Sequence, residues 1–220
     1  MEYKALSKNE EAQGKSLVDA SLNNGVRHFV FTSADRGGAK SDNDPTNVPH
    51  FITKHNIEQH LFAKAKSSNM NWTVLRPVAF CENLAPGFFG KVFTTSWAMR
   101  LKKTQKLQLV ATSDIGYFAA DSFLNPESDQ YKNKSISLAG DELTFDQFKE
   151  IFEQKTHETL PTTYRFLTGM ILSSVKELGY MFKWFHDVGF GADIQSLKQV
   201  NPSMKDFKTW LETESSWKSR

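Results

Sequence analysis

The sequence predicts an α/β fold with a parallel sheet and flanking helices, and three observations support this prediction. Short runs of β-branched and aromatic residues alternate along the chain with segments that carry apolar residues at helical spacing. With 220 residues, 39% hydrophobic and 13% aromatic, the chain is long enough to bury a substantial core. The segments between the runs can hold the crossover helices that parallel strands require.

The first half of the chain alternates predicted helices and strands. In chain order these are a helix over 9–24, the strand HFVFTS over 28–33, a helix over about 49–66 and the strand WTVLR over 72–76. Gly25 suits the left-handed stop after the first helix. A polar loop over 34–45 separates the first strand from the second helix. This order predicts parallel strands that are joined by helices.

The second half continues the pattern. It contains a predicted helix over about 88–101, a strand over 107–112, a helix from about 113, a strand over 135–139 and a helix from about 145. Thr144 and Gln147 have the spacing of a capping box, and an apolar stripe over 171–185 is typical of a core-facing helix. We expect a single domain over 1–220. Within it, 1–84 and 113–140 form the sheet core, and 85–112 and 141–220 form a small C-terminal lobe for substrate or partner.

Composition excludes several classes of protein. Lys and Arg total 27 against 25 Asp and Glu, a net charge of +2, which gives no long-range field for nucleic acid. The single cysteine, Cys81, excludes internal disulfides and cysteine-based zinc sites. The most apolar segment, 169–185, contains three charged residues, and the N-terminus lacks the apolar core of a signal peptide. We expect no membrane contact and a location in the cytoplasm, with the nucleus as an additional location.

Histidines at positions 50, 55 and 60 do not predict a metal site. Each five-residue step turns about 140° around a helix, so the three imidazoles point in different directions. We therefore expect no metal.

His50 and Lys54 are the strongest catalytic candidates. Residues four apart on a helix project from the same face. Short-chain dehydrogenases place a tyrosine and a lysine with this spacing, so that the lysine holds the nicotinamide ribose and lowers the pKa of the phenol. Position 50 is a histidine instead. From spacing alone, Lys54 is equally suited to an exposed ion pair with Glu58, and such pairs are common.

Six collinear blocks carry a resemblance to a known family. They are EAQGK at 11–15, HFVFTS at 28–33, VPHFITK at 48–54, LRPVAFCENL at 75–84, SDIGYFAA at 113–120 and LAGDELT at 138–144. In this order they resemble the NmrA-like family, atypical members of the short-chain dehydrogenase superfamily with a Rossmann-type fold. In that family the helix typically reads His-Phe-x-x-Lys. The histidine at position 50 is thus a family feature.

The resemblance implies a nicotinamide site. Lys54 matches the lysine that contacts the ribose of NADP, and the nicotinamide end of the cleft is matched by Phe80, Cys81, Glu82 and Asn83. Ser33 follows a strand at the end where parallel sheets place ligand contacts. The alternative for Phe80 and Cys81 is core packing, and the alternative for the next two residues is bracing of the following turn.

One departure from the family concerns the cofactor. The sequence has no glycine-rich strand-to-helix turn of the kind that binds a diphosphate, and relative to the family it begins at the helix after the fourth strand. We therefore expect an N-terminally truncated sheet and weak or absent binding of NADP or NAD by this chain alone. The strand over 28–33 should become an exposed edge that invites self-association or pairing with another chain.

Three functions follow as hypotheses. The first is a regulatory, redox-sensing relative of the dehydrogenases that binds a protein partner such as a transcription factor. The second is an NADP-dependent oxidoreductase acting on a small carbonyl or quinone, with His50 as a proton relay. The third is a truncated remnant without activity.

Overall fold

The computed structural model describes the backbone of residues 2–217 and the side chains of residues 9–217. The helices are α1 (Glu2–Asn23), α2 (Pro49–Ala65), α3 (Phe88–Arg100), α4 (Thr112–Leu124), α5 (Phe145–Thr156), α6 (Arg165–Ser174), α7 (Lys176–Asp187), α8 (Ile194–Val200) and α9 (Phe207–Thr213). The strands are β1 (His28–Thr32), β2 (Asn71–Pro77), β3 (Ala79–Phe80), β4 (Lys106–Val110), β5 (Lys134–Leu138) and β6 (Asp141–Thr144). Two short 3-10 helices, η1 (Gly38–Asp42) and η2 (Cys81–Leu84), lie between them.

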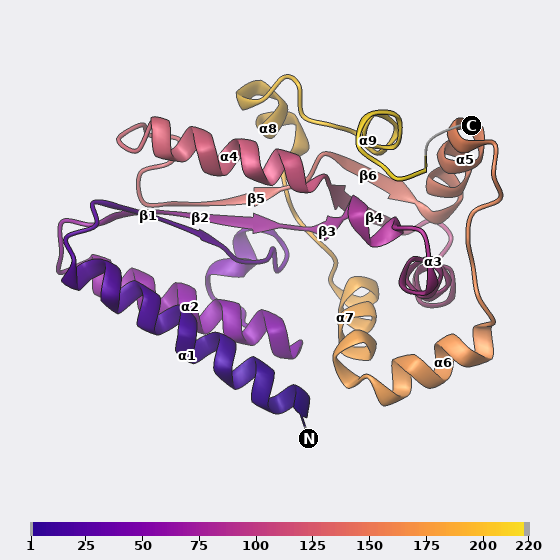
Figure 1. Ribbon diagram of the computed structural model, residues 1–220, viewed down its shortest axis with the longest axis horizontal. Helices are drawn as coiled ribbons and strands as arrows, with labels where there is room; N and C mark the ends of the chain where they lie inside the picture. Colours follow the sequence, from indigo (N-terminus) through magenta and orange to yellow (C-terminus); the bar gives the residue numbers. More distant parts are fainter. Residues whose placement is uncertain (1, 218–220) are drawn as a thin grey trace.

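The main sheet has the strand order β1-β2-β5, and both pairs of neighbours are parallel. Helices α1 and α2 cover one face and α4 covers the other (Figure 1). Apolar residues of β1 and β2 pack against α1 and α2 around Val18, Leu61 and Val74. The opposite face packs against α4 around Leu75 and Phe118. The predicted α/β fold with parallel strands and flanking helices is confirmed.

A second sheet, of order β3-β4-β6, lies beside the first. Strand β4 pairs in parallel with β3 and antiparallel with β6. Helices α3, α5, α6 and α7 gather around this end of the molecule (Figure 1), where the largest apolar cluster contains Trp97, Phe148 and Phe182. The capping box of Thr144 and Gln147 at the start of α5 is confirmed.

A buried ionic cluster fixes the loop after β1 to α2 and β2. The carboxylate of Glu58 accepts hydrogen bonds from Arg36 at 3.2 and 2.8 Å and from Arg76 at 3.2 and 2.7 Å. The side chains of Glu58 and Arg36 are fully buried, and that of Arg76 is 3% exposed. The alternative pairing of Lys54 with Glu58 is wrong, because Glu58 faces the core.

Asp35, in the same loop, is a second buried acid, and it bonds to groups from three parts of the chain. Its carboxylate accepts hydrogen bonds from the backbone N–H groups of Gly37 at 3.0 Å, Gly38 at 2.9 Å and Gly191 at 2.9 Å, and from the Ser137 hydroxyl at 2.5 Å. The backbones at Gly38 and Gly191 approach so closely that a Cβ on Gly38 would lie 2.5 Å from the Gly191 carbonyl oxygen. The loop after β1 therefore depends on a segment late in the chain.

Two further expectations concern absent features. Within residues 2–217, no helix combines the length and apolar character needed to cross a membrane. The described side chains, those of residues 9–217, include no group of three or more His, Cys, Asp or Glu that could hold a metal ion.

Candidate functional site

A cleft of about 230 Å³ lies at the carboxyl ends of β1 and β2, between α2 and α7. Its lining includes five residues that the sequence predicts for the site, namely Ser33, His50, Lys54, Phe80 and Asn83. Their positions follow from local structure. Ser33 follows the end of β1. His50 and Lys54 lie one turn apart at the start of α2. Phe80 lies on β3 and Asn83 on η2, directly after β2. Because parallel strands end at the same edge, these segments meet.

Two other predicted residues do not line the cleft. Cys81 is 3% exposed and packs in the core, and burial raises the pKa of its thiol. Glu82 accepts hydrogen bonds from the backbone N–H of Thr112 at 3.0 Å, from its hydroxyl at 2.7 Å and from the indole of Trp210 at 3.2 Å. The first turn of η2 thus directs Cys81 into the core and Glu82 toward α4 and α9.

Lys54 lies at the boundary between the cleft and α1. Its ammonium nitrogen is 3.0 Å from a carboxylate oxygen of Glu10 and 5.9 Å from the ring centroid of Phe31. The other Glu10 oxygen accepts the Thr53 hydroxyl at 2.7 Å. Burial raises the pKa of Glu10, but the hydrogen bonds from Thr53 and Lys54 outweigh burial and hold that pKa below its ordinary value. A ribose in the cleft would have to share Lys54 with Glu10.

His50 faces α7. Its Nδ1 lies against Oε1 of Glu177, but the approach lacks hydrogen-bond geometry and leaves Nδ1 without a hydrogen-bond partner in the described part of the chain. Burial is the main cause that lowers the pKa of His50, and the positive charge of Lys54 lowers it further, to about 4. The negative charge of Glu10 opposes this shift only in part. Burial and the Glu10 charge raise the pKa of Glu177. His50 is therefore a neutral imidazole at pH 7.

Sequence reasoning missed Glu10 and Glu177. Glu10 lies on α1 and Glu177 on α7, and both reach the site only through tertiary contacts with α2. One signal was present: Glu177 interrupts the apolar stripe over 171–185, and a carboxylate on a buried helix face needs a polar partner.

The low pKa of His50 predicts a pH-dependent stability. The unfolded chain takes up a proton at this residue near pH 6.5, whereas the folded chain does so only near pH 4. The contribution of neutral His50 to the free energy of unfolding is therefore fully present above pH about 6.5, and it is lost as the pH falls from there to about 4. We expect the free energy of unfolding, measured by urea denaturation, to fall across this window.

A His50→Asn variant is the matched control for this prediction, because it keeps a polar side chain that does not titrate. Its free energy of unfolding should fall less steeply than that of the wild type across the same window. Parallel curves for the two proteins would show that the pKa of His50 is near its ordinary value.

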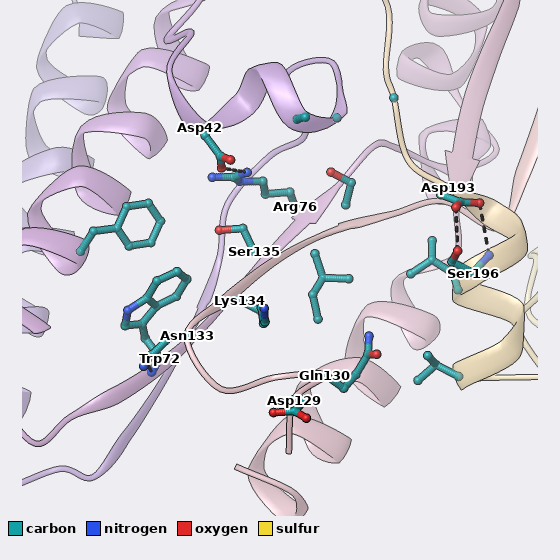
Figure 2. A pocket seen from close by; sticks show the side chains of 18 of the residues that line it. Asp42, Trp72, Arg76, Asp129, Gln130, Asn133, Lys134, Ser135, Asp193 and Ser196 are labelled. Atoms are coloured by element: carbon teal, nitrogen blue, oxygen red, sulfur yellow. Dashed lines mark hydrogen bonds and ion pairs between the residues drawn. The ribbon is translucent and has the colours of Figure 1, made fainter. Parts of the chain in front are cut away.

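A second and larger hollow, of about 1050 Å³, lies along the free side of β5 between η1, α2 and α8. Figure 2 shows Arg76 and Asp42 paired at one side of it, and the Asp193 side chain bonded to Ser196 at another. None of the predicted site residues lines it. Because Arg76 is already bonded to Glu58 and Asp42, the smaller cleft at the strand ends remains the candidate site.

Comparison with known proteins identifies the family. The NmrA-like family matches residues 3–213. The chain belongs to the NmrA-like family. The resemblance carried by the six sequence blocks is therefore confirmed over nearly the whole chain.

Solved structures share the fold of this NmrA-like chain. Nmra, a negative transcriptional regulator, superposes with a TM-score of 0.69 at 13% identity over 96% of this chain and 71% of its own. A nucleoside-diphosphate-sugar epimerase from Staphylococcus aureus gives 0.63 at 14% identity over 93% and 71%. The triphenylmethane reductase of Citrobacter sp., complexed with NADP(H), gives 0.61 at 15% identity over 90% and 69%. At these identities the likeness establishes the fold alone.

The cleft of this NmrA-like protein offers a limited set of groups to a nicotinamide ribose. Lys54 supplies a cation, Asn83 an exposed amide, and Phe80 a ring that is 37% exposed. The Ser33 hydroxyl is 3.4 Å from a guanidinium nitrogen of Arg36 and is partly engaged. These residues fit the nicotinamide end of a dinucleotide. The cleft volume of about 230 Å³ is below the roughly 300 Å³ at which pockets for drug-sized ligands begin.

Proposed function

We propose that this NmrA-like protein is a regulatory, redox-sensing relative of the short-chain dehydrogenases that binds NADP or NAD weakly and acts through a protein partner such as a transcription factor. The observation that carries this proposal is the state of the two residues where dehydrogenases place their catalytic pair. Lys54 is bound to Glu10, and His50 is a neutral imidazole held against Glu177. Neither is arranged to protonate an alkoxide with the help of the other.

The size of the cleft supports weak binding. Most of the affinity for a dinucleotide comes from its diphosphate and adenosine, which require a glycine-rich turn at a helix N-terminus. The cleft of about 230 Å³ has room for the nicotinamide end, so the contacts within it supply the smaller share of that affinity. Weak occupancy near cellular cofactor concentrations is the behaviour that a sensor of the cofactor pool requires.

Relatives support both the cofactor and the regulatory role. Nmra is described as a negative transcriptional regulator and has been solved in complex with NAD and with NADP. Nmra shares the fold of this chain and binds the two cofactors that we propose for the cleft.

A second candidate is an NADP-dependent oxidoreductase acting on a small carbonyl or quinone. It is favoured by the placement of His50 and Lys54 side by side in one cleft and by the reductase of Citrobacter sp. that was solved with NADP(H). A neutral imidazole can relay a proton.

Titration with NADPH by calorimetry tests the sensor proposal. We expect a dissociation constant of about 0.1 mM or weaker, which corresponds to roughly 5.5 kcal/mol or less of binding free energy. Lys54→Ala should weaken binding by about tenfold or more, because a charge-assisted hydrogen bond contributes about 1.5–3 kcal/mol. Lys64→Ala is the matched control, because Lys64 lies on the same helix but outside the cleft, and it should bind like the wild type.

Three other outcomes would contradict the proposal. Micromolar affinity together with consumption of NADPH in the presence of a quinone would establish the oxidoreductase. No heat of binding at millimolar NADPH would leave a chain without cofactor function. Equal weakening by Lys54→Ala and Lys64→Ala would place the cofactor elsewhere.

A further inference from the structure

A further hollow, of about 670 Å³, lies between the end of α3 and the helices α6 and α7. On α7 it is lined by Lys176, Tyr180 and Lys183, which project from one face of the helix. The candidate site is lined by Met181 and Phe185 of the same helix, which project from the opposite face. Helix α7 therefore separates this hollow from the cleft.

The lining of this hollow is positively charged. Arg100, Lys176 and Lys183 contribute three cations against one carboxylate, Asp187. That carboxylate is already engaged, because the Lys183 ammonium and Nδ1 of His186 both bind it. The lining thus has a net charge of +2, which equals the net charge of the whole chain.

Most of the cations in and beside the hollow lack an acidic partner. Those that form no ion pair within residues 9–217 are Arg100, Lys102, Lys103 and Lys176. The segment 101–105 is held against the end of α7, because the Gln105 amide donates to the carbonyls of Phe185 at 2.8 Å and His186 at 3.0 Å. Cations that the fold holds together repel one another, and a ligand with negative charge relieves this repulsion.

Helix α6 adds an apolar stripe that leads into the hollow. Phe166, Met170 and Ser173 are exposed and lie on one face of α6. The exposed fractions of the first two are 71% and 59%, and Ser173 lines the hollow. Figure 1 shows α6 at the outside of the molecule, below α3. Arginine, methionine and aromatic residues are the types enriched at protein interfaces. We call this stripe and the lining of the hollow together the α6–α7 surface.

We propose that the α6–α7 surface binds an acidic segment of a protein partner that also carries apolar residues. This inference rests on the proposed function, because the segment belongs to the partner that the proposed function requires. Its carboxylates lie in the hollow against Arg100, Lys176 and Lys183, and its apolar side chains lie on Phe166 and Met170. Charge complementarity selects such a segment and repels a basic one.

The shape of the surface distinguishes a protein segment from other anionic partners. The cations line a hollow, which receives a protruding chain but not the flat surface of an anionic bilayer. The stripe of Phe166 and Met170 supplies apolar contact area, and burial of apolar side chains contributes affinity that exposed ion pairs alone do not. A nucleic acid, whose outer surface is phosphate, makes no use of this stripe.

Fluorescence anisotropy with a labelled synthetic peptide tests the proposal. The probe is a short peptide with a block of Leu and Phe beside a block of Glu, and we expect saturable binding that weakens as salt is added. The double variant Arg100→Glu and Lys176→Glu should raise the dissociation constant about tenfold or more. Phe166→Ser should raise it by a similar factor, because the apolar block loses its contact.

Matched controls separate the α6–α7 surface from general charge and stickiness. The double variant Lys66→Glu and Lys208→Glu changes the net charge equally at exposed residues outside the hollow, and it should bind the probe like the wild type. Phe89→Ser should also bind normally, since Phe89 is 87% exposed but lies at the start of α3. Circular dichroism of each variant confirms that it is folded.

Several results would overturn the inference. These are a probe that does not bind, equal weakening in the two charge-reversal variants, or tighter binding of single-stranded DNA or of phosphatidylserine vesicles than of the peptide. The test contains no cofactor, so its failure is distinguishable from failure of the proposed function. Peptide binding lost with NADPH binding intact would contradict the α6–α7 surface alone, whereas peptide binding without any NADPH binding would support this surface and contradict the sensor.

Discussion

Replacement of Glu58 by alanine should lower the free energy of unfolding by about 3–5 kcal/mol, enough to unfold a domain of ordinary stability. The reason is the environment of the carboxylate. It is fully buried and accepts four hydrogen bonds from the guanidinium groups of Arg36 and Arg76. Without it, two buried cations lose their main partner and repel each other. Urea denaturation of the purified variant measures the loss.

Two further variants make the result specific. Glu58→Gln keeps the shape but removes the charge, and its loss should be close to that of the alanine variant. Glu142→Ala removes a carboxylate whose pairing with Lys106 is exposed, and its free energy of unfolding should change by less than about 0.5 kcal/mol. A loss below about 1 kcal/mol in Glu58→Ala would mean that the cluster is solvated.

Trp97→Ala should also destabilise the protein by about 3–5 kcal/mol. The indole is fully buried, with ring centroids 4.6 Å from Phe148, 5.9 Å from Phe145 and 6.2 Å from Phe93. It joins α3 to α5, so its removal leaves a cavity at the centre of the largest apolar cluster. Thermal and urea denaturation should both show the loss.

Trp97→Phe is the matched control for the cavity. It keeps an aromatic ring and removes the indole N–H, which is buried without a hydrogen-bond partner among the described residues. Since an unpaired buried donor is itself unfavourable, the loss should be about 1 kcal/mol or less. Equal losses in the two variants would show that the cluster depends on the full size of the indole, and that a smaller aromatic ring at this position does not fill the space.

The sequence predicted the main sheet because its strands are the strongest local signals in the chain. HFVFTS and WTVLR are short apolar runs between polar segments, and the helices that join them fix their parallel direction. The two-residue strand β3 and the four-residue strand β6 are too short to show alternation. The second sheet was therefore not predicted, although β4 was.

The candidate site, like the sheets, could be predicted from the sequence only in part. Ser33, His50 and Lys54 could be placed from the sequence, because the end of a strand and the spacing of a helix determine where they point. The directions of Cys81 and Glu82 depend on a single 3-10 turn, and a local pattern does not specify its rotation. Glu10 and Glu177 reach the site only through tertiary packing.

The hydrogen bonds to the Asp35 carboxylate have a consequence for synthesis of the chain. Its carboxylate belongs to the first loop, yet one of its hydrogen bonds comes from Gly191, which lies 156 residues later. A nascent chain emerging from the ribosome has made β1 long before it contains that partner. The full set of hydrogen bonds to this carboxylate can form only when almost the whole polypeptide is present, and until then water must take the place of the missing donor.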